Sequence, residues 1–130
     1  MANEYTRKWN YYPREEDYKL QSLWANFQRK HEFNPIHSHN SVMSFVCWMS
    51  IPYSIQDELS LESVKNSRAK AASIFQFVYT DIIGRICHED FFVDKDWAGR
   101  VIMFPAKLHH QVYPFYTSDG FRISISGNLA

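Results

Sequence analysis

The sequence predicts an all-β protein, built as a sandwich or barrel of short strands. Aromatic residues make up 17% of the 130 residues, and aromatic side chains favour the pleated, half-buried surface of a sheet. About eight short apolar or alternating segments follow one another, separated by turn signals. A chain of this length is typical of one domain, which we expect to span residues 1–130.

The first half of the chain contains an arm, two strands and one exception to the pattern. Residues 1–20 are polar and aromatic, and they predict an extended N-terminal arm. Strands are expected at 22–27 and at 42–51, which is apolar on both faces, as in a strand covered on both sides. Residues 56–72 are polar, charged and rich in helix formers, which predicts a short helix or a loop. A solvated connection is the favoured interpretation of this segment, and a lid over a site is the alternative.

The second half of the chain contains the remaining strands, each of them short and bounded by turn residues. A tight turn through Asp81 and Gly84 predicts a hairpin between the first two of these strands. The expected strands are 73–80, 82–87, 91–93, 100–104, 108–113 and 121–126.

Charge and hydropathy exclude several classes of partner. Fourteen Lys and Arg residues balance 14 Asp and Glu residues, so the chain lacks the basic excess of proteins that bind nucleic acid or anionic membranes. No apolar run approaches the roughly 18 residues of a membrane span, and the N-terminus has no signal-peptide pattern. We therefore expect a cytoplasmic protein that binds neither nucleic acid nor membrane.

The last expected strand carries a regular alternation of apolar and polar residues. A plain surface strand would give the same alternation, but here the polar side is one cation followed by small polar groups. A guanidinium offers two parallel donors to a carboxylate, and a neighbouring hydroxyl adds a third. Arg122 and Ser124 are therefore a candidate carboxylate receptor.

Histidines supply the candidate metal ligands. His37 and His39 are two residues apart, so in an extended segment both side chains project to one side and can share a metal ion. His109 and His110 must face opposite ways in a strand. His110 lies at even spacing between two apolar residues, so we expect it to point inward and His109 to point outward.

Together these motifs resemble a known enzyme family. The order is H-x-H at His37, a long apolar strand, F-P-x-x-L-x-H-x-V-x-P from Phe104, and R-I-S-I-S from Arg122. This order resembles small phage and bacterial proteins of the iron(II)/2-oxoglutarate dioxygenase superfamily, close to its prolyl-hydroxylase-like group. The likeness covers about half of the chain, in residues 22–52, 75–85 and 104–128.

The resemblance implies a double-stranded β-helix, a jelly-roll or cupin-like fold, with Fe(II) near one open end and 2-oxoglutarate as a small-molecule cosubstrate. His37 and His110 would be the first and the distal metal histidines, with His39 as a third ligand. Arg122, assisted by Ser124, would pair with the far carboxylate of 2-oxoglutarate. The implied reaction hydroxylates a C–H bond, in a prolyl or other protein side chain or in a small metabolite, and forms succinate and CO2.

His39 is a departure from the superfamily, which usually has an aspartate at this position. Three neutral imidazoles leave the full +2 charge on the ion, which favours an anionic cosubstrate but also suits copper, zinc or nickel. An oxygen ligand from Glu32, or from an acid in residues 56–72, is the alternative to His39.

Two other functions fit the same residues. A cupin-type enzyme with three histidines would use the metal without 2-oxoglutarate, and it would have no general need for the Arg122–Ser124 pair. A non-catalytic jelly-roll binding or structural module would fit the short chain, which leaves little room for substrate-binding insertions. The same brevity would allow a homodimer that completes the site or covers an exposed strand edge.

Overall fold

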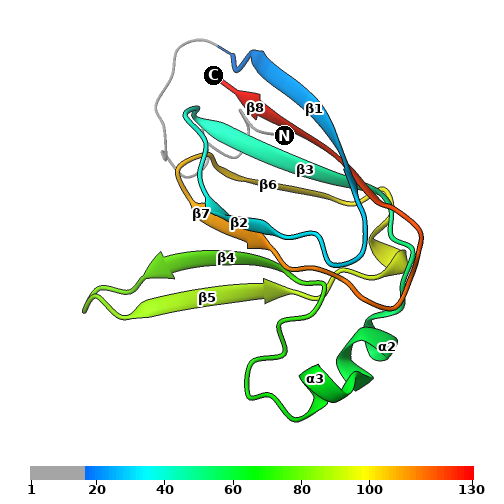
Figure 1. Cartoon of the computed structure of the whole chain (residues 1–130). Helices are drawn as coiled ribbons and strands as arrows, with labels where there is room; N and C mark the ends of the chain where they lie inside the picture. The colour runs from blue at the N-terminus through cyan, green and yellow to red at the C-terminus, as the bar shows by residue number, and fades with distance from the viewer. Residues whose placement is uncertain (1–16) are drawn as a thin grey trace.

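The structure, a computed structural model, describes residues 17–130, so most of the arm expected at 1–20 lies outside the described residues. Two four-stranded sheets face each other as layers (Figure 1). The first contains β1 (Leu20–Gln28), β8 (Arg122–Leu129), β3 (Met43–Ser50) and β6 (Val101–Pro105), in that order. The second contains β2 (Asn34–His37), β7 (His109–Val112), β4 (Phe75–Thr80) and β5 (Ile86–Phe91).

The strand pairing is nested from the ends of the chain inward. β1 pairs with β8, β2 with β7, β3 with β6 and β4 with β5, all antiparallel. Successive pairs alternate between the two sheets, and the contacts of β3 with β8 and of β4 with β7 complete each sheet. This is the connectivity of a long hairpin rolled into a sandwich. It confirms the predicted all-β, jelly-roll-like fold.

The hairpin of β4 and β5 differs from the prediction. The strands expected at 82–87 and 91–93 are one strand, β5, which begins only at residue 86. The turn before it is longer than expected, because the Asp81 carboxylate accepts hydrogen bonds from two backbone N–H groups of the turn, at 3.0 and 2.9 Å. Gly84 completes the turn with a positive φ of 81°. Ile82 is consequently fully exposed at the tip instead of lying in a strand.

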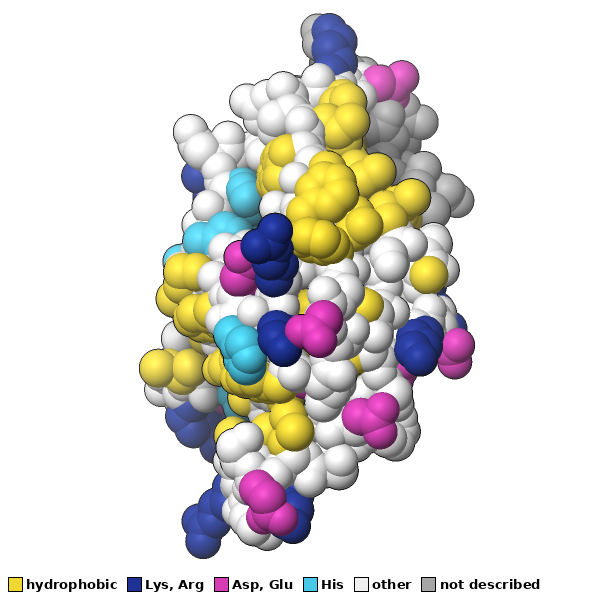
Figure 2. Space-filling view, turned by 45° about the vertical axis from the view of Figure 1, so that its right-hand side comes forward, with side chains coloured by type: hydrophobic (Ala, Val, Ile, Leu, Met, Phe, Trp, Pro, Cys, Tyr) yellow, Lys and Arg dark blue, Asp and Glu magenta, His cyan; other side chains and the backbone are white. Residues whose placement is uncertain are grey.

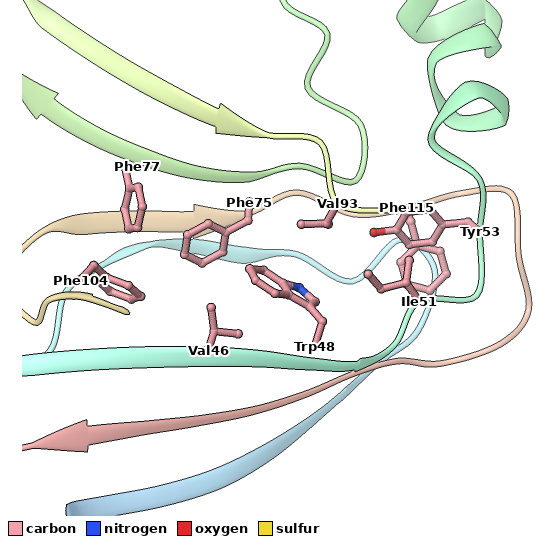
Figure 3. Close-up of a cluster of buried hydrophobic side chains, with 9 residues drawn as sticks. All are labelled: Val46, Trp48, Ile51, Tyr53, Phe75, Phe77, Val93, Phe104 and Phe115. Atoms are coloured by element: carbon pink, nitrogen blue, oxygen red, sulfur yellow. The ribbon is translucent and has the colours of Figure 1, made fainter. Parts of the chain in front are cut away.

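The hydrophobic core lies between the two sheets. Phe75 and Phe77 of β4 face Trp48 and Val46 of β3 across this space (Figure 3). The rings of Trp48 and Phe75 meet edge to face, with centroids 5.7 Å apart, which is a favoured aromatic geometry. Part of the high aromatic content of the sequence therefore fills the interior of the sandwich.

Two short helices, α2 (Ile55–Ser60) and α3 (Glu62–Lys65), occupy the segment where a helix or loop was expected, and a 3-10 turn, η1 (Lys95–Trp97), precedes β6. The segment that contains α2 and α3 is more than a solvated connection, because its Glu58 is completely buried. Its carboxylate accepts hydrogen bonds from the backbone N–H groups of Tyr116, at 3.0 Å, and Thr117, at 2.8 Å, and from the Thr117 hydroxyl. Glu58 therefore fastens the helices to the loop that leads into β8.

We expect Glu58→Ala to lower the free energy of unfolding by about 3 kcal/mol, because it leaves buried N–H groups without an acceptor. Urea denaturation followed by tryptophan fluorescence measures the change. Glu62→Ala is the matched control, since this exposed carboxylate on α3 pairs with Lys65 at the surface and its loss should cost less than about 1 kcal/mol. Equal losses in the two variants would show that the Glu58 contacts do not stabilise the fold.

The surface carries exposed hydrophobic side chains as well as charged ones. One face carries a patch of hydrophobic side chains in the upper part of the view, and positive and negative groups are interspersed over the rest of that face (Figure 2). Within residues 17–130, none of the helices combines the length and the hydropathy that crossing a membrane requires.

Candidate metal centre

A cavity of about 730 Å³ lies between the two sheets, within the size range of small-molecule sites. Its walls differ in chemistry. The histidines come from the second sheet and from the segment directly after β2, and the aromatic rings come from both sheets. Most of the polar groups come from the inward faces of β1, β3 and β8. These polar residues are Asn26, Gln28, Ser44, Arg122, Ser124 and Ser126.

The fold brings the three predicted histidines together in this cavity. His37 is the last residue of β2, and it pairs with His110 of β7 in the second sheet. His39 follows directly after β2 and is held by a 2.8 Å hydrogen bond from its backbone N–H to the carbonyl oxygen of Ala106. The three side chains offer ligand nitrogens that all lie within 4.8 Å of one another. The strand β2 itself was not predicted, and because it ends at His37, only the first histidine of the H-x-H motif lies in a strand.

Hydrogen bonds to backbone carbonyls orient two of the three rings. The Nδ1 atom of His37 lies 2.7 Å from the carbonyl oxygen of Pro35, and Nδ1 of His110 lies 3.0 Å from that of Leu108. A carbonyl oxygen only accepts, so each Nδ1 carries the proton and each Nε2 is left as a free electron-pair donor. Such bonds are the usual way in which a metal-binding imidazole is held in one tautomer.

The spacing of two of the three nitrogens fits a single metal ion. The Nε2 atoms of His39 and His110 are 3.2 Å apart. Two nitrogens that bind one ion at about 2.1 Å and at right angles are themselves about 3 Å apart. The set of donors therefore suits a borderline transition metal such as Fe(II) or Zn(II).

The two adjacent histidines of β7 differ in burial, as the strand register predicts. His110 is 4% exposed and packs against the rings of Phe75, Phe77 and Phe104, whereas His109 is exposed. Among residues 17–130, no carboxylate belongs to the cluster of potential ligands. Glu32 lines the cavity but accepts a hydrogen bond from the backbone of Arg29.

Burial favours the uncharged form of two of the imidazoles, those of His39 and His110. The pKa of His110 is lowered to about 4, mainly by burial; the hydrogen bond to the Leu108 carbonyl opposes this as the next-largest effect, and the nearby His37, His39 and His109 each add a smaller lowering. Burial, followed by the proximity of His37, also lowers the pKa of His39. Only a neutral imidazole can bind a metal, so these two residues need not lose a proton to do so at neutral pH.

The lowered pKa of His110 has a consequence for the metal-free protein. The folded pKa, about 4, lies below the unfolded value of 6.5, so the unfolded chain binds more protons between these values. We expect the free energy of unfolding to fall by about 2 kcal/mol between pH 7 and pH 4.5, less than the full shift implies because water in the cavity screens the charge. Denaturation of EDTA-treated protein at the two pH values measures this change. His110→Gln should flatten the dependence, and an unchanged slope in that variant would exclude His110 as its cause.

Arg122 is the polar centre of the same cavity. Its side chain is on the inward face of β8, only 3% exposed, beside the stacked rings of Tyr53 and Phe115. Within the described part of the chain it forms no salt bridge. Its guanidinium instead donates hydrogen bonds to Tyr53 Oη at 2.8 Å, Ser73 O at 2.9 Å, Tyr113 O at 2.7 Å and Gln28 Oε1 at 2.8 and 3.2 Å. A buried positive charge of this kind attracts an anion.

Comparison with known families bears on this pairing of three histidines with a buried arginine. A family model described as "Putative 2OG-Fe(II) oxygenase" matches residues 22–128, which include all of these side chains. The chain belongs to the 2OG-Fe(II) oxygenase family. No curated protein matches it.

Ser124 lies beside Arg122 on the cavity face of this oxygenase family member, as the alternation in β8 predicts. Its hydroxyl accepts a 3.3 Å hydrogen bond from the amide of Asn26, which also reaches Ser126 at 3.4 Å. The partners of Arg122 in β1 and in the loops were missed from the sequence. Only Gln28 had a local signal, because it alternates with Asn26 on the inward face of β1.

Proposed function

We propose that the protein is an Fe(II)- and 2-oxoglutarate-dependent oxygenase that hydroxylates a C–H bond of its substrate. One observation carries the proposal: three converging imidazole nitrogens line the same cavity as a buried arginine that has no acidic partner among residues 17–130. A metal and a dicarboxylate can therefore be held side by side. Membership of the 2OG-Fe(II) oxygenase family supports the same pair of cofactors.

In this proposal the three histidines hold the iron. The carbonyl oxygens of Pro35 and Leu108 fix the rings of His37 and His110, so these two nitrogens need little reorganisation to bind. His39 takes the position where a carboxylate would otherwise reduce the positive charge of the site. The neutral ligands leave that charge at +2, which strengthens the binding of an anionic cosubstrate.

Arg122 is proposed to bind the far carboxylate of 2-oxoglutarate, and Ser124 to add a hydroxyl donor. A hydrogen bond between a guanidinium and a carboxylate is strong because both partners are charged, and it is stronger still in a site with little water. The aromatic wall of Trp48, Phe75 and Phe104 limits water in the cavity. It thereby protects the reacting groups from competing reactions.

When bound, iron(II) with 2-oxoglutarate and O2 supplies the oxidising chemistry, in which one oxygen atom enters succinate, CO2 is released, and the other oxygen atom hydroxylates the substrate. The chain's own residues bind and orient the two cofactors and exclude water. We propose a prolyl or other protein side chain as the substrate, with a small metabolite as the alternative.

A three-histidine metalloenzyme that does not use 2-oxoglutarate is the second candidate. One observation favours it: all five N–H groups of Arg122 are used by acceptors within the protein. In that function Arg122 would only tie β8 to β1 and to the loops around it, and the histidines alone would act.

Succinate formation separates the two candidates. The Fe(II)-loaded protein, given 2-oxoglutarate and ascorbate in air, should produce succinate slowly even without a substrate. The matched control is the His110→Ala variant under the same conditions. Consumption of 2-oxoglutarate no faster than in this control would favour the second candidate.

A further inference from the structure

Gln28 occupies one edge of the Arg122 guanidinium. Its amide oxygen accepts hydrogen bonds from Nη2 at 2.8 Å and from Nε at 3.2 Å. Because arginine has only donors, the atom that faces it must be the oxygen of the amide. The Nε and Nη2 pair is also an edge on which a carboxylate binds through two parallel hydrogen bonds. The glutamine oxygen therefore sits where a carboxylate oxygen would sit.

The other donors of Arg122 are turned towards the protein and cannot be released as easily. Two of their acceptors are backbone carbonyl oxygens, of Ser73 and Tyr113, and the third is the hydroxyl of the buried Tyr53. Gln28, by contrast, is the last residue of β1, is only half-buried and lines the cavity. Among the partners that the described residues supply, it is the one best placed to move aside by rotation of a side chain.

We propose that Gln28 is a placeholder, and that the far carboxylate of 2-oxoglutarate binds Arg122 by displacing its amide oxygen. The inference rests on the proposed function, since it concerns the same dicarboxylate. In the ligand-free protein Gln28 satisfies a buried guanidinium that would otherwise lack acceptors. The cosubstrate must break these two hydrogen bonds, so Gln28 weakens its binding and sets its affinity.

Displacement of Gln28 also changes the turn that follows β1. The Nε2 atom of Gln28 donates to the carbonyl oxygen of Glu32, and the Glu32 side chain accepts from the backbone of Arg29 at 2.7 Å. In the same turn, His31 has a positive φ of 68° and donates to the carbonyl oxygen of Phe115. Binding of 2-oxoglutarate therefore frees the end of β1 from the turn that leads to β2 and His37.

Calorimetric titration of 2-oxoglutarate into the Zn(II)-loaded protein tests the proposal, because zinc is redox-inactive and no turnover interferes. Gln28→Ala should bind 2-oxoglutarate on the order of tenfold more tightly than the wild type, since no hydrogen bond to the charged guanidinium has to be broken first. Gln21→Ala is the matched control. This exposed glutamine of the same strand does not line the cavity, and its loss should leave the affinity unchanged.

Gln28→Glu provides a second variant of the same size, in case the alanine variant is poorly folded. Its carboxylate should pair with Arg122 and weaken 2-oxoglutarate binding at least tenfold. In the wild type, the side-chain amide signal of Gln28 in a 15N spectrum, identified by its absence in Gln28→Ala, should shift when 2-oxoglutarate is added.

The outcomes test the displacement of Gln28 separately from the use of 2-oxoglutarate as the cosubstrate. Unchanged or weaker binding by Gln28→Ala, wild-type affinity in Gln28→Glu, or an unmoved Gln28 amide signal would each overturn displacement while leaving 2-oxoglutarate as the cosubstrate. Binding of 2-oxoglutarate by Gln28→Ala but not by the wild type would support displacement, and it would mean that Gln28 blocks the site completely. An absence of binding in the wild type and in Gln28→Ala would overturn the proposed function together with the role of Gln28.

Discussion

Replacing His110 with alanine is expected to abolish stoichiometric iron binding, with a loss of affinity greater than about 100-fold. Substitutions of groups that only support a metal ligand already cost 10- to 100-fold, and His110 is proposed as a ligand itself. Its Nε2 atom lies 3.2 Å from that of His39, and no carboxylate in the described part of the chain joins the cluster to replace it. Metal analysis of the purified variant after loading with Fe(II) and gel filtration measures the loss.

His109→Ala is the matched control for this experiment. The two histidines are neighbours in β7, but His109 is exposed and faces away from the cavity. Its removal should leave one iron per chain and change the free energy of unfolding by no more than about 0.5 kcal/mol. Loss of iron in the His109 variant with retention in the His110 variant would show that the proposed ligand set is wrong.

Replacing Arg122 with lysine is expected to weaken 2-oxoglutarate binding at least tenfold, which corresponds to about 1.4 kcal/mol. Lysine keeps the positive charge but has no planar fork to hold a carboxylate through two parallel hydrogen bonds. The substitution should leave iron binding intact, because the arginine does not belong to the histidine cluster. Calorimetry on the metal-loaded variant measures the affinity.

The stability of the Arg122 variants has to be followed in parallel. Arg122 donates to acceptors in β1 and in loops on both sides of the cavity, so Arg122→Leu should also lose several kcal/mol of unfolding free energy. Arg68→Lys, at an exposed position in the loop after α3, controls for the change of residue type. Unaltered affinity in a folded Arg122→Lys variant would place the carboxylate receptor elsewhere.

The parts of the site that lie on single strands could be predicted from the sequence. The alternation of apolar and polar residues in β8 predicted that Arg122 and Ser124 lie on the same face of that strand. The apolar residues on either side of His110 predicted which side chains of β7 point inward. Both inferences depend only on the two-residue period of a strand. The same period applies to His37 and His39, although the short strand β2 ends between them.

The contacts between distant segments could not be predicted. Gln28 meets Arg122 across 94 residues of sequence, and Tyr53 meets it across 69, so no local pattern connects them. Glu58 was included in a polar segment whose composition favours solvent, yet the fold buries it against the backbone of the loop before β8. In each case the pairing of strands decides which polar groups meet, and that information is not local.

Anaerobic titration of the Fe(II)-loaded protein with 2-oxoglutarate tests the central claim most directly, because it needs neither a substrate nor turnover. The proposed function predicts one 2-oxoglutarate bound per chain, with a charge-transfer absorption that develops in step with binding. It also predicts that this absorption is absent from the His110→Ala variant and requires higher 2-oxoglutarate concentrations in Arg122→Lys. Failure of the iron-loaded protein to bind 2-oxoglutarate, or equal binding by the metal-free protein, would contradict the claim that one cavity holds both.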